Sequence, residues 1–123
     1  MSAPLKILSV DDEPSIAQSM RFIFTQPLFE LASALDGETA LARMAREPES
    51  FDVVITDNNM PGVSGVELVR QLREREFSGK IMVLSAHLST DVRAAYETLD
   101  VDAMIEKPFN VKTLRATIEK LAA

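Results

Sequence analysis

Short apolar runs alternate with amphipathic segments along the whole chain, and this alternation constrains the fold more than any other feature. Apolar residues between the runs recur at helical spacing. Strands that alternate with helices predict a parallel sheet covered by helices on both faces. We therefore expect an α/β fold, a doubly wound (βα)5 sheet. Its five strands are predicted at Leu5–Val10, Phe29–Ala34, Phe51–Thr56, Lys80–Leu84 and Val101–Ile105.

Chain crossovers between parallel strands are right-handed, which limits how five strands can be ordered. The common five-strand solution is the flavodoxin-like order 2-1-3-4-5. In that order the first and third strands are neighbours where the winding reverses, and ligands bind there, beyond the carboxyl ends of the strands. The length, 123 residues, predicts one domain over residues 1–123.

Prolines and apolar spacing place the helices between these strands. Pro14 fits the first turn of the first helix, where a missing N–H costs little, and Pro27 ends that helix. The second helix is expected to end before Pro48. The fourth helix carries the apolar positions of 92–99, and the fifth those of 111–121.

Composition excludes several classes of function. The chain has no cysteine, which excludes thiol catalysis, zinc–thiolate sites and disulfides, and its single histidine, His87, argues against a multi-histidine metal site. The formal net charge of −6 predicts that the domain does not bind nucleic acid directly. No segment approaches the ~18 consecutive apolar residues of a membrane span. Because residues 1–6 are also too short for a signal peptide, we expect no membrane contact and a cytoplasmic location.

Five polar side chains lie at, or just beyond, the ends of predicted strands. They are Asp11, Asp12, Asp57, Ser85 and Lys107. In a parallel sheet these strand ends meet at one edge, about 4.8 Å apart from strand to strand. Three carboxylates, a hydroxyl and an ammonium would then form a site for a hard divalent cation and a phosphoryl group.

The three carboxylates repel one another unless a cation is present. Mg²⁺ suits them best, because it binds one or two carboxylates together with waters and phosphate oxygens; Mn²⁺ is the alternative ion. Taken singly, Asp12 could merely cap the first helix, and Asp11 and Asp57 could be solvated strand ends. Their convergence at neighbouring strands favours the metal site.

Asp57 is the candidate nucleophile, since a carboxylate can take a phosphoryl group to give an acyl phosphate. Lys107 could neutralise charge on the phosphoryl oxygens, and Ser85 could donate a hydrogen bond. Lys107 precedes Pro108, so that peptide bond can be cis. Taken alone, Ser85 could equally satisfy a local backbone group, and Lys107 to Phe109 could be an ordinary loop before a helix.

These motifs together resemble a receiver domain of a two-component response regulator, of the chemotaxis-regulator type. The matching segments cover essentially the whole chain in the right order, and each alone is weak while the ordered set is specific. They are Val10–Glu13, Thr56–Gly62, Gly65, Leu84–Ala86 and Glu106–Phe109.

The resemblance implies a role for each residue at the sheet edge. Asp57 resembles the phospho-acceptor. Asp12 and Asp57 resemble the direct Mg²⁺ ligands, with Asp11 acting largely through bound water. Asn59 resembles the residue whose backbone carbonyl completes the metal site. Such a domain is a signalling module that phosphorylates and dephosphorylates itself, not an enzyme acting on a separate substrate.

The resemblance also implies partners. Ser85 and Lys107 resemble the pair that contacts the phosphoryl group. The donor would be a phosphohistidine on a sensor histidine kinase or a histidine phosphotransfer protein. The downstream effector is not indicated by the sequence. A homodimer through the face of the fourth helix, fifth strand and fifth helix is a further expectation from the family.

Two positions depart from the family pattern. The family usually has an aromatic residue three positions before the lysine, which swings inward as the Ser or Thr moves onto the phosphoryl group; here that position is Met104. A flexible thioether can fill the space but presents no ring plane or hydroxyl. The small Gly-Ala pair that usually precedes the fifth strand is replaced by Asp100–Val101.

Two other functions remain open from the residues. A haloacid-dehalogenase-type phosphatase also uses an aspartate nucleophile with Mg²⁺ and a lysine, but its nucleophile follows the first strand in an Asp-x-Asp motif, whereas here that strand ends Asp11–Asp12–Glu13. A degenerate receiver could act only as a protein-binding scaffold. The intact acidic set argues against the scaffold, while Met104 keeps it open.

Overall fold

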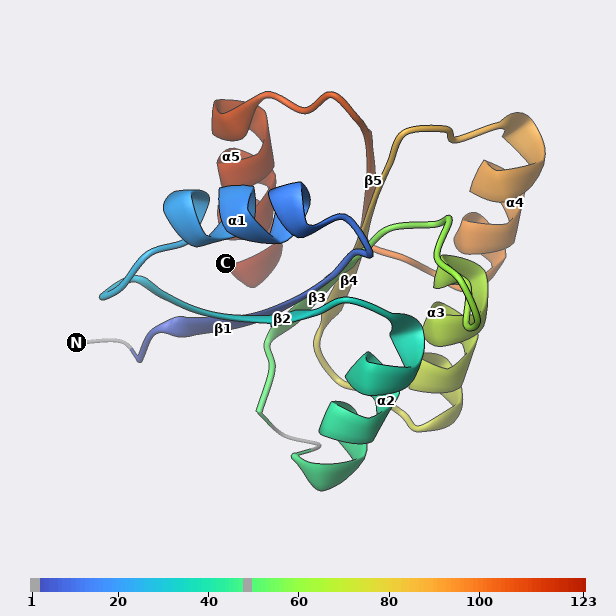
Figure 1. Cartoon of the computed structure of the whole chain (residues 1–123), viewed down its shortest axis with the longest axis horizontal. Coiled ribbons are helices and arrows are strands. Elements are labelled where there is room, and N and C mark those ends of the chain that lie inside the picture. The colour runs from blue at the N-terminus through green and yellow to red at the C-terminus, as the bar shows by residue number, and fades with distance from the viewer. Residues whose placement is uncertain (1–2, 48–49) are drawn as a thin grey trace.

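The computed structural model describes residues 3–47 and 50–123, and within these ranges five strands alternate with five helices (Figure 1). The strands are β1 (Leu5–Val10), β2 (Phe29–Ala34), β3 (Val53–Thr56), β4 (Lys80–Ser85) and β5 (Ala103–Glu106). The helices are α1 (Pro14–Ile23), α2 (Gly37–Arg46), α3 (Gly65–Glu74), α4 (Thr90–Thr98) and α5 (Val111–Ala122).

The strands form one parallel sheet in the order β2-β1-β3-β4-β5, which confirms the predicted fold. The register aligns Val10 of β1 with Thr56 of β3, and Thr56 with Val83 of β4. The residues that follow these strands are therefore brought to one edge of the sheet.

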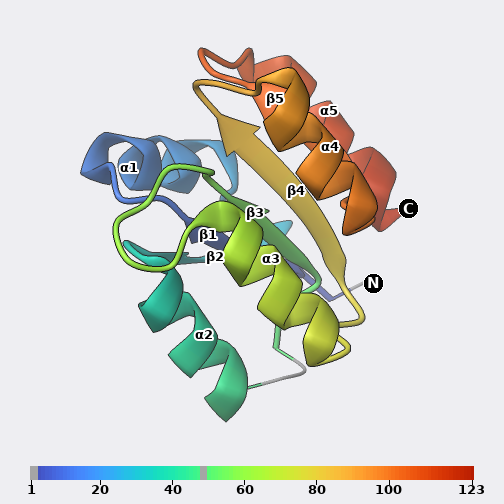
Figure 2. The same cartoon turned by 90° about the vertical axis from the view of Figure 1, so that its right-hand side faces the viewer.

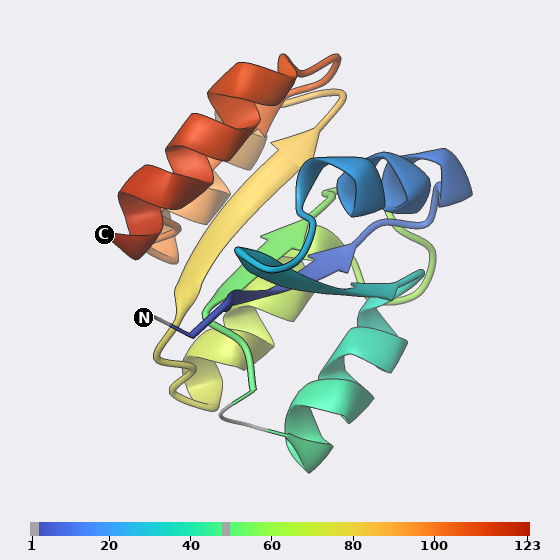
Figure 3. The same cartoon turned by 90° about the vertical axis from the view of Figure 1, so that its left-hand side faces the viewer.

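Both faces of the sheet are buried, as a parallel sheet requires. Leu8, Val54 and Val83 point to the face covered by α2, α3 and α4, and Ile7 and Ile55 point to the face covered by α1 and α5. The views in Figures 1 to 3 show this division of helices between the two sides of the sheet. The two apolar clusters hold the strands rigidly enough to position side chains at their ends.

Two strands begin later than the apolar pattern predicted. β3 starts at Val53, because the preceding Asp52 uses its carboxylate to accept a bond from the Lys6 N–H at 2.9 Å. β5 starts at Ala103, because Asp102 accepts a bond from the Ile81 N–H at 2.8 Å with its side chain. At both starts the side-chain bond stands beside a backbone bond, since the Asp52 N–H donates to the Lys6 carbonyl and the Asp102 N–H to the Ile81 carbonyl, each at 2.8 Å.

Helix starts follow sequence signals closely. The cap residues Asp36, Ser64, Ser89 and Asn110 each accept a bond from the backbone N–H three positions later, as expected for helix N-termini. α1 instead begins with Pro14 in its first turn. The predicted end of the second helix concerns Pro48, which lies outside the described residues; α2 ends at Arg46.

The ends of α3 and α4 place non-glycine residues in the left-handed region, at Glu76 (φ 57°) and Asp100 (φ 56°). After α4, the Asp100 N–H donates to Glu97 and the Val101 N–H donates to Tyr96, a Schellman arrangement in which glycine usually takes the left-handed position. Asp100 thus takes the left-handed position that glycine usually occupies in this motif.

Replacing Asp100 by glycine should therefore stabilise the protein. We expect Asp100→Gly to raise the free energy of unfolding by about 0.5–1 kcal/mol, because a side chain in the left-handed region costs more than the extra chain entropy of glycine. Glu97→Gly, an exposed position inside α4, is the matched control and should lower it by about 1 kcal/mol. Urea unfolding of the three proteins measures both changes, and a loss of stability in Asp100→Gly would contradict this account.

Candidate functional site at the carboxyl edge of the sheet

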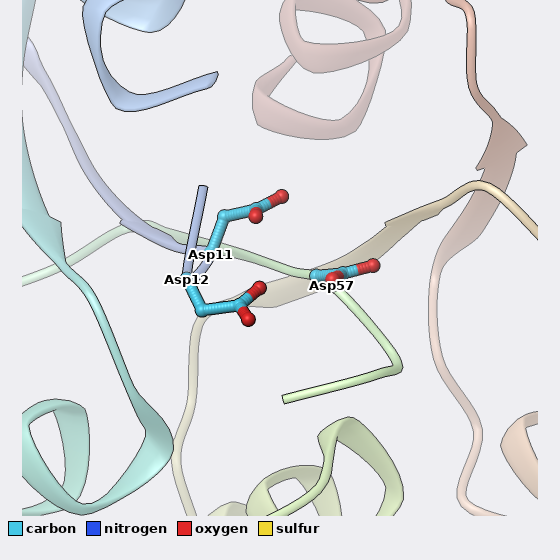
Figure 4. A group of neighbouring side chains, drawn as sticks. All are labelled: Asp11, Asp12 and Asp57. Carbon is cyan, nitrogen blue, oxygen red and sulfur yellow. The ribbon is translucent and has the colours of Figure 1, made fainter. Parts of the chain in front are cut away.

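Three carboxylates converge where β1 and β3 end, at the centre of the sheet. The Asp57 N–H donates to the Val10 carbonyl at 2.9 Å, so the chain after β3 stays aligned with β1. Carboxylate oxygens of Asp11, Asp12 and Asp57 all lie within 4.8 Å of one another. Figure 4 shows the side chains of Asp11 and Asp12 extending from the end of β1 toward the side on which Asp57 lies.

Lys107, in the loop after β5, contributes the positively charged side chain of this site. Its Nζ donates to Asp11 Oδ2 at 2.7 Å and lies 3.8 Å from Asp57 Oδ1 and 3.7 Å from Glu13 Oε1. The Lys107–Pro108 peptide bond is cis. The ammonium is therefore placed between two of the clustered carboxylates, and Glu13 is a neighbour that the sequence did not indicate.

Burial and neighbouring charges together shift the pKa values of Asp57 and Lys107. Burial raises the pKa of the Asp57 carboxyl and the charge of Asp11 raises it further, while Lys107 acts to lower it. Burial alone would lower the pKa of Lys107, but its hydrogen bond to Asp11 and the charges of Asp11, Asp57 and Glu13 outweigh that effect and raise it. Lys107 therefore stays protonated. Burial and the charge of Asp11 make the ionised form of the Asp57 carboxyl energetically unfavourable.

Ser85 ends β4 with its side chain fully buried. Its hydroxyl lies close enough to lower the pKa of Asp57 slightly, yet within the described residues it forms no hydrogen bond of normal distance and angle. The backbone of Ser85 is used, since its carbonyl accepts from the Lys107 N–H at 2.8 Å. The hydroxyl is therefore a donor held at the site without a fixed partner.

The oxygen-only donor set fits a hard divalent cation. Asp12 is exposed, and it does not cap α1, because the cap position belongs to Glu13 and no side chain caps that helix. Asp11 accepts from the Glu13 N–H at 3.0 Å as well as from Lys107. Asn59 follows Asp57 in the same loop, and the role of its carbonyl as a metal ligand stays a prediction.

A contact between Tyr96 and Asn58 at the site was missed by sequence reasoning. The Tyr96 hydroxyl of α4 donates to Asn58 Oδ1 at 2.6 Å, directly beside Asp57. A Cβ on Gly65 would overlap both the Asp57 carbonyl and the Tyr96 hydroxyl, so Gly65 makes room for this contact. The sequence offered one signal, a tyrosine within the apolar stripe of a helix, whose hydroxyl needs a partner when buried.

Met104 stands on β5 opposite Val83 of β4. It is half-buried and packs against the apolar cluster beneath α2, α3 and α4, which also contains Tyr96. The methionine thus fills apolar space on this face; its part in a switch stays a prediction.

The chain belongs to the response regulator receiver domain family. The family model matches residues 7–119, nearly the whole chain. Receiver domains of this family are signalling domains rather than classical enzymes, so the family argues against the phosphatase alternative. Among the described residues, no helix is both long and apolar enough to cross a membrane.

Curated relatives and solved structures agree with this family. The sensory transduction protein RegX3 of Mycobacterium bovis is 34% identical over 91% of this chain and 48% of that protein. The alkaline phosphatase synthesis transcriptional regulatory protein PhoP of Bacillus subtilis is 29% identical over 94% of this chain and 48% of that protein. The chain thus spans about half the length of the curated relatives it matches.

The fold is also close to solved receiver domains. The chemotaxis protein CheY4 of Vibrio cholerae superimposes with a TM-score of 0.88 at 31% identity, covering 97% of this chain and 99% of that chain. A BeF3-activated DrrB receiver domain superimposes with a TM-score of 0.84 at 26% identity, covering 96% and 97%.

Removing the charge of Asp57 should stabilise the protein. We expect Asp57→Asn to raise the midpoint of thermal unfolding at pH 7 without added metal, because burial and Asp11 both disfavour an ionised carboxylate at this position. Glu30→Gln is the matched control, since it removes one negative charge from an exposed position of β2 and should change the midpoint little. An equal or lower midpoint for Asp57→Asn would show that the acidic cluster is not under electrostatic strain.

Proposed function

We propose that this chain is a single receiver domain that accepts a phosphoryl group on Asp57 and passes the resulting change to a protein-interaction face. The observation that carries the proposal is the convergence of Asp57 with Asp11 and Asp12 within 4.8 Å, beside a protonated Lys107 at 3.8 Å. A buried nucleophilic carboxylate flanked by metal-binding carboxylates and a fixed ammonium suits phosphoryl transfer.

A divalent cation, Mg²⁺ or Mn²⁺, is the proposed cofactor. Asp12 and Asp57 would bind it directly, Asp11 through water, and Asn59 through its backbone carbonyl. When bound, it supplies positive charge to the phosphoryl oxygens and relieves the repulsion within the acidic cluster.

The transfer itself needs few residues. A carboxylate oxygen of Asp57 attacks the phosphorus of a phosphohistidine and forms an oxygen–phosphorus bond. The phosphorus–nitrogen bond breaks, and its electron pair goes to the ring nitrogen, which leaves as neutral histidine when the other nitrogen carries the proton. Lys107 neutralises charge on the phosphoryl oxygens, and the Ser85 hydroxyl donates a hydrogen bond to one of them.

The proposed donor is a sensor histidine kinase or a histidine phosphotransfer protein. Because such a donor takes its phosphoryl group from ATP, we propose that the reaction occurs in the cytoplasm. The proposed output is a contact with another protein, including a second copy of this chain, through the face of α4, β5 and α5. We propose no direct contact with nucleic acid or a membrane by this domain.

Metal binding should depend on Asp12. Titration of Mg²⁺ is expected to move the backbone amide resonances of residues 11–13 and 57–60, because these surround the proposed ligands. Asp12→Ala should weaken binding by at least tenfold, since it removes a direct carboxylate ligand. Asp91→Ala, at an exposed position in the first turn of α4, removes the same charge elsewhere and should leave the affinity nearly unchanged. Amides that stay unmoved at saturating Mg²⁺ would contradict the site.

Asp57 should be the one residue that is phosphorylated. Incubation with acetyl phosphate and Mg²⁺ is expected to add a single phosphoryl group, detected by intact mass, and Asp57→Ala should abolish it. Lys107→Ala should still bind Mg²⁺ but label at least tenfold more slowly, because the charge on the phosphoryl oxygens loses its fixed counter-charge.

Full labelling of Asp57→Ala would place the acceptor elsewhere. A wild-type chain that binds Mg²⁺ but never labels would instead favour the scaffold function, the alternative that Met104 keeps open.

A further inference from the structure

Only one side chain of α4 is buried in the core. Of its nine residues, all within the described part of the chain, Tyr96 alone is buried, and it is 0% exposed. Of the other apolar residues of the helix, Val92 and Ala95 are only half-buried and Ala94 is exposed. The position of α4 over the sheet therefore depends mainly on where the Tyr96 ring lies.

The Tyr96 ring reaches the loop of the proposed phospho-acceptor. Its hydroxyl donates to Asn58 Oδ1 at 2.6 Å, and Asn58 is the residue that follows Asp57. The Asn58 carbonyl in turn accepts from the Gly65 N–H at 3.0 Å, at the start of α3. Asn58 is thus held between two helices, by its backbone on one side and by its side chain on the other.

This contact is tight and polar in an apolar surrounding. Burial raises the pKa of the Tyr96 hydroxyl, and the charge of Asp57 raises it further, so the hydroxyl keeps its proton and remains a donor. The Tyr96 hydroxyl packs directly against the backbone of Gly65, because a Cβ added to Gly65 would overlap the hydroxyl. A movement of the loop after Asp57 must therefore displace Tyr96 or break the bond.

The other ties of α4 are weaker routes for a signal from Asp57. Arg93 pairs with Glu106 at 2.8 Å, but their side chains are 39% and 52% exposed, and exposed ion pairs contribute little. Arg73 of α3 donates to the carbonyls of Leu99 and Asp100, just after the end of α4, and Arg93 Nε donates to the Leu88 carbonyl before its start. None of these contacts involves the loop after Asp57.

We propose that Tyr96, through its bond to Asn58, couples the state of Asp57 to the position of α4, an inference that rests on the proposed phosphorylation of Asp57. In this chain the aromatic ring that links the site to the signalling face is on α4, while β5 carries Met104. Tyr96 is a positioning residue, since it touches neither the proposed metal nor the phosphoryl group.

The coupling follows from differential contacts. A phosphoryl group on Asp57 recruits the Ser85 hydroxyl and Lys107, and the loop that carries Asn58 adjusts to the new charge. A ligand shifts a conformational equilibrium only through contacts that differ between the two states. The Tyr96–Asn58 bond is such a contact, because it joins the loop that changes to the helix that must move.

Tyrosine fluorescence offers a direct test, because the chain contains one tyrosine and no tryptophan. Emission from Tyr96 depends on the hydrogen bond of its hydroxyl. Acetyl phosphate and Mg²⁺ should change the emission of the wild-type chain in proportion to the phosphorylated fraction measured by intact mass. Asp57→Asn is the control and should show no change on addition of acetyl phosphate. Unchanged emission from a fully phosphorylated chain would overturn the proposal.

A second test removes only the hydroxyl. Amide NMR shifts are recorded with Mg²⁺ alone and with Mg²⁺ and beryllofluoride, a phosphoryl mimic. In Tyr96→Phe, the amides of residues 57–60 should still respond, while the response of residues 90–98 should fall at least twofold. Thr98→Val is the matched control, since it removes an exposed hydroxyl that bonds within the same helix, to the Ala94 carbonyl, and should keep the full response.

The outcomes separate this proposal from the proposed function. A full α4 response in Tyr96→Phe, or a large response at Met104 with none in α4, would overturn the role of Tyr96 while leaving phosphorylation of Asp57 intact. A wild-type chain with no response at residues 57–60 would contradict the proposed function itself, and the inference would fall with it. Urea unfolding of Tyr96→Phe verifies that the variant is folded in these experiments.

Discussion

Negative charge concentrated at the ends of β1 and β3 is the constraint on which the rest of the structure depends. Like charges this close are tolerated only where the backbone fixes them, and here the backbone is the pair of central strands, buried on both faces. Lys107 offsets part of the repulsion through its 2.7 Å bond to Asp11. The same repulsion would favour binding of the proposed cation, which would offset an electrostatic cost to the folded state.

The stability that carries this cost comes from elsewhere in the chain. Strand residues such as Ile7, Val54 and Met82 are almost completely buried, and side-chain caps begin four of the five described helices. Each such cap contributes about 1 kcal/mol, a large share of a marginal total. Because of this stability, the protein tolerates, at the edge with the site, carboxylates that repel one another. It also tolerates the Ser85 hydroxyl without a fixed partner.

The fold and the acidic cluster could be predicted from the sequence, because both follow from local patterns of apolar residues and from the residues at the strand ends. Apolar runs identify strands buried on both faces, and strand order then brings Asp11, Asp12 and Asp57 together. The strand starts at Val53 and Ala103 were missed, because they depend on side-chain bonds between neighbouring strands. The Tyr96–Asn58 bond joins residues 38 positions apart and depends on how α4 packs, which no spacing rule encodes.

The position of the aromatic ring bears on how a signal leaves the site. A ring on β5 would belong to a strand that is fixed by its hydrogen-bonded pairing with β4. The ring of Tyr96 belongs instead to a helix with no other buried side chain. Elements with few buried contacts move at low free-energy cost. Coupling between two sites is also reciprocal, so whatever binds α4 and shifts Tyr96 must alter the Asn58 loop by the same free energy. If Asp57 is phosphorylated as proposed, a partner docked on α4 would therefore change how readily Asp57 accepts and keeps the phosphoryl group.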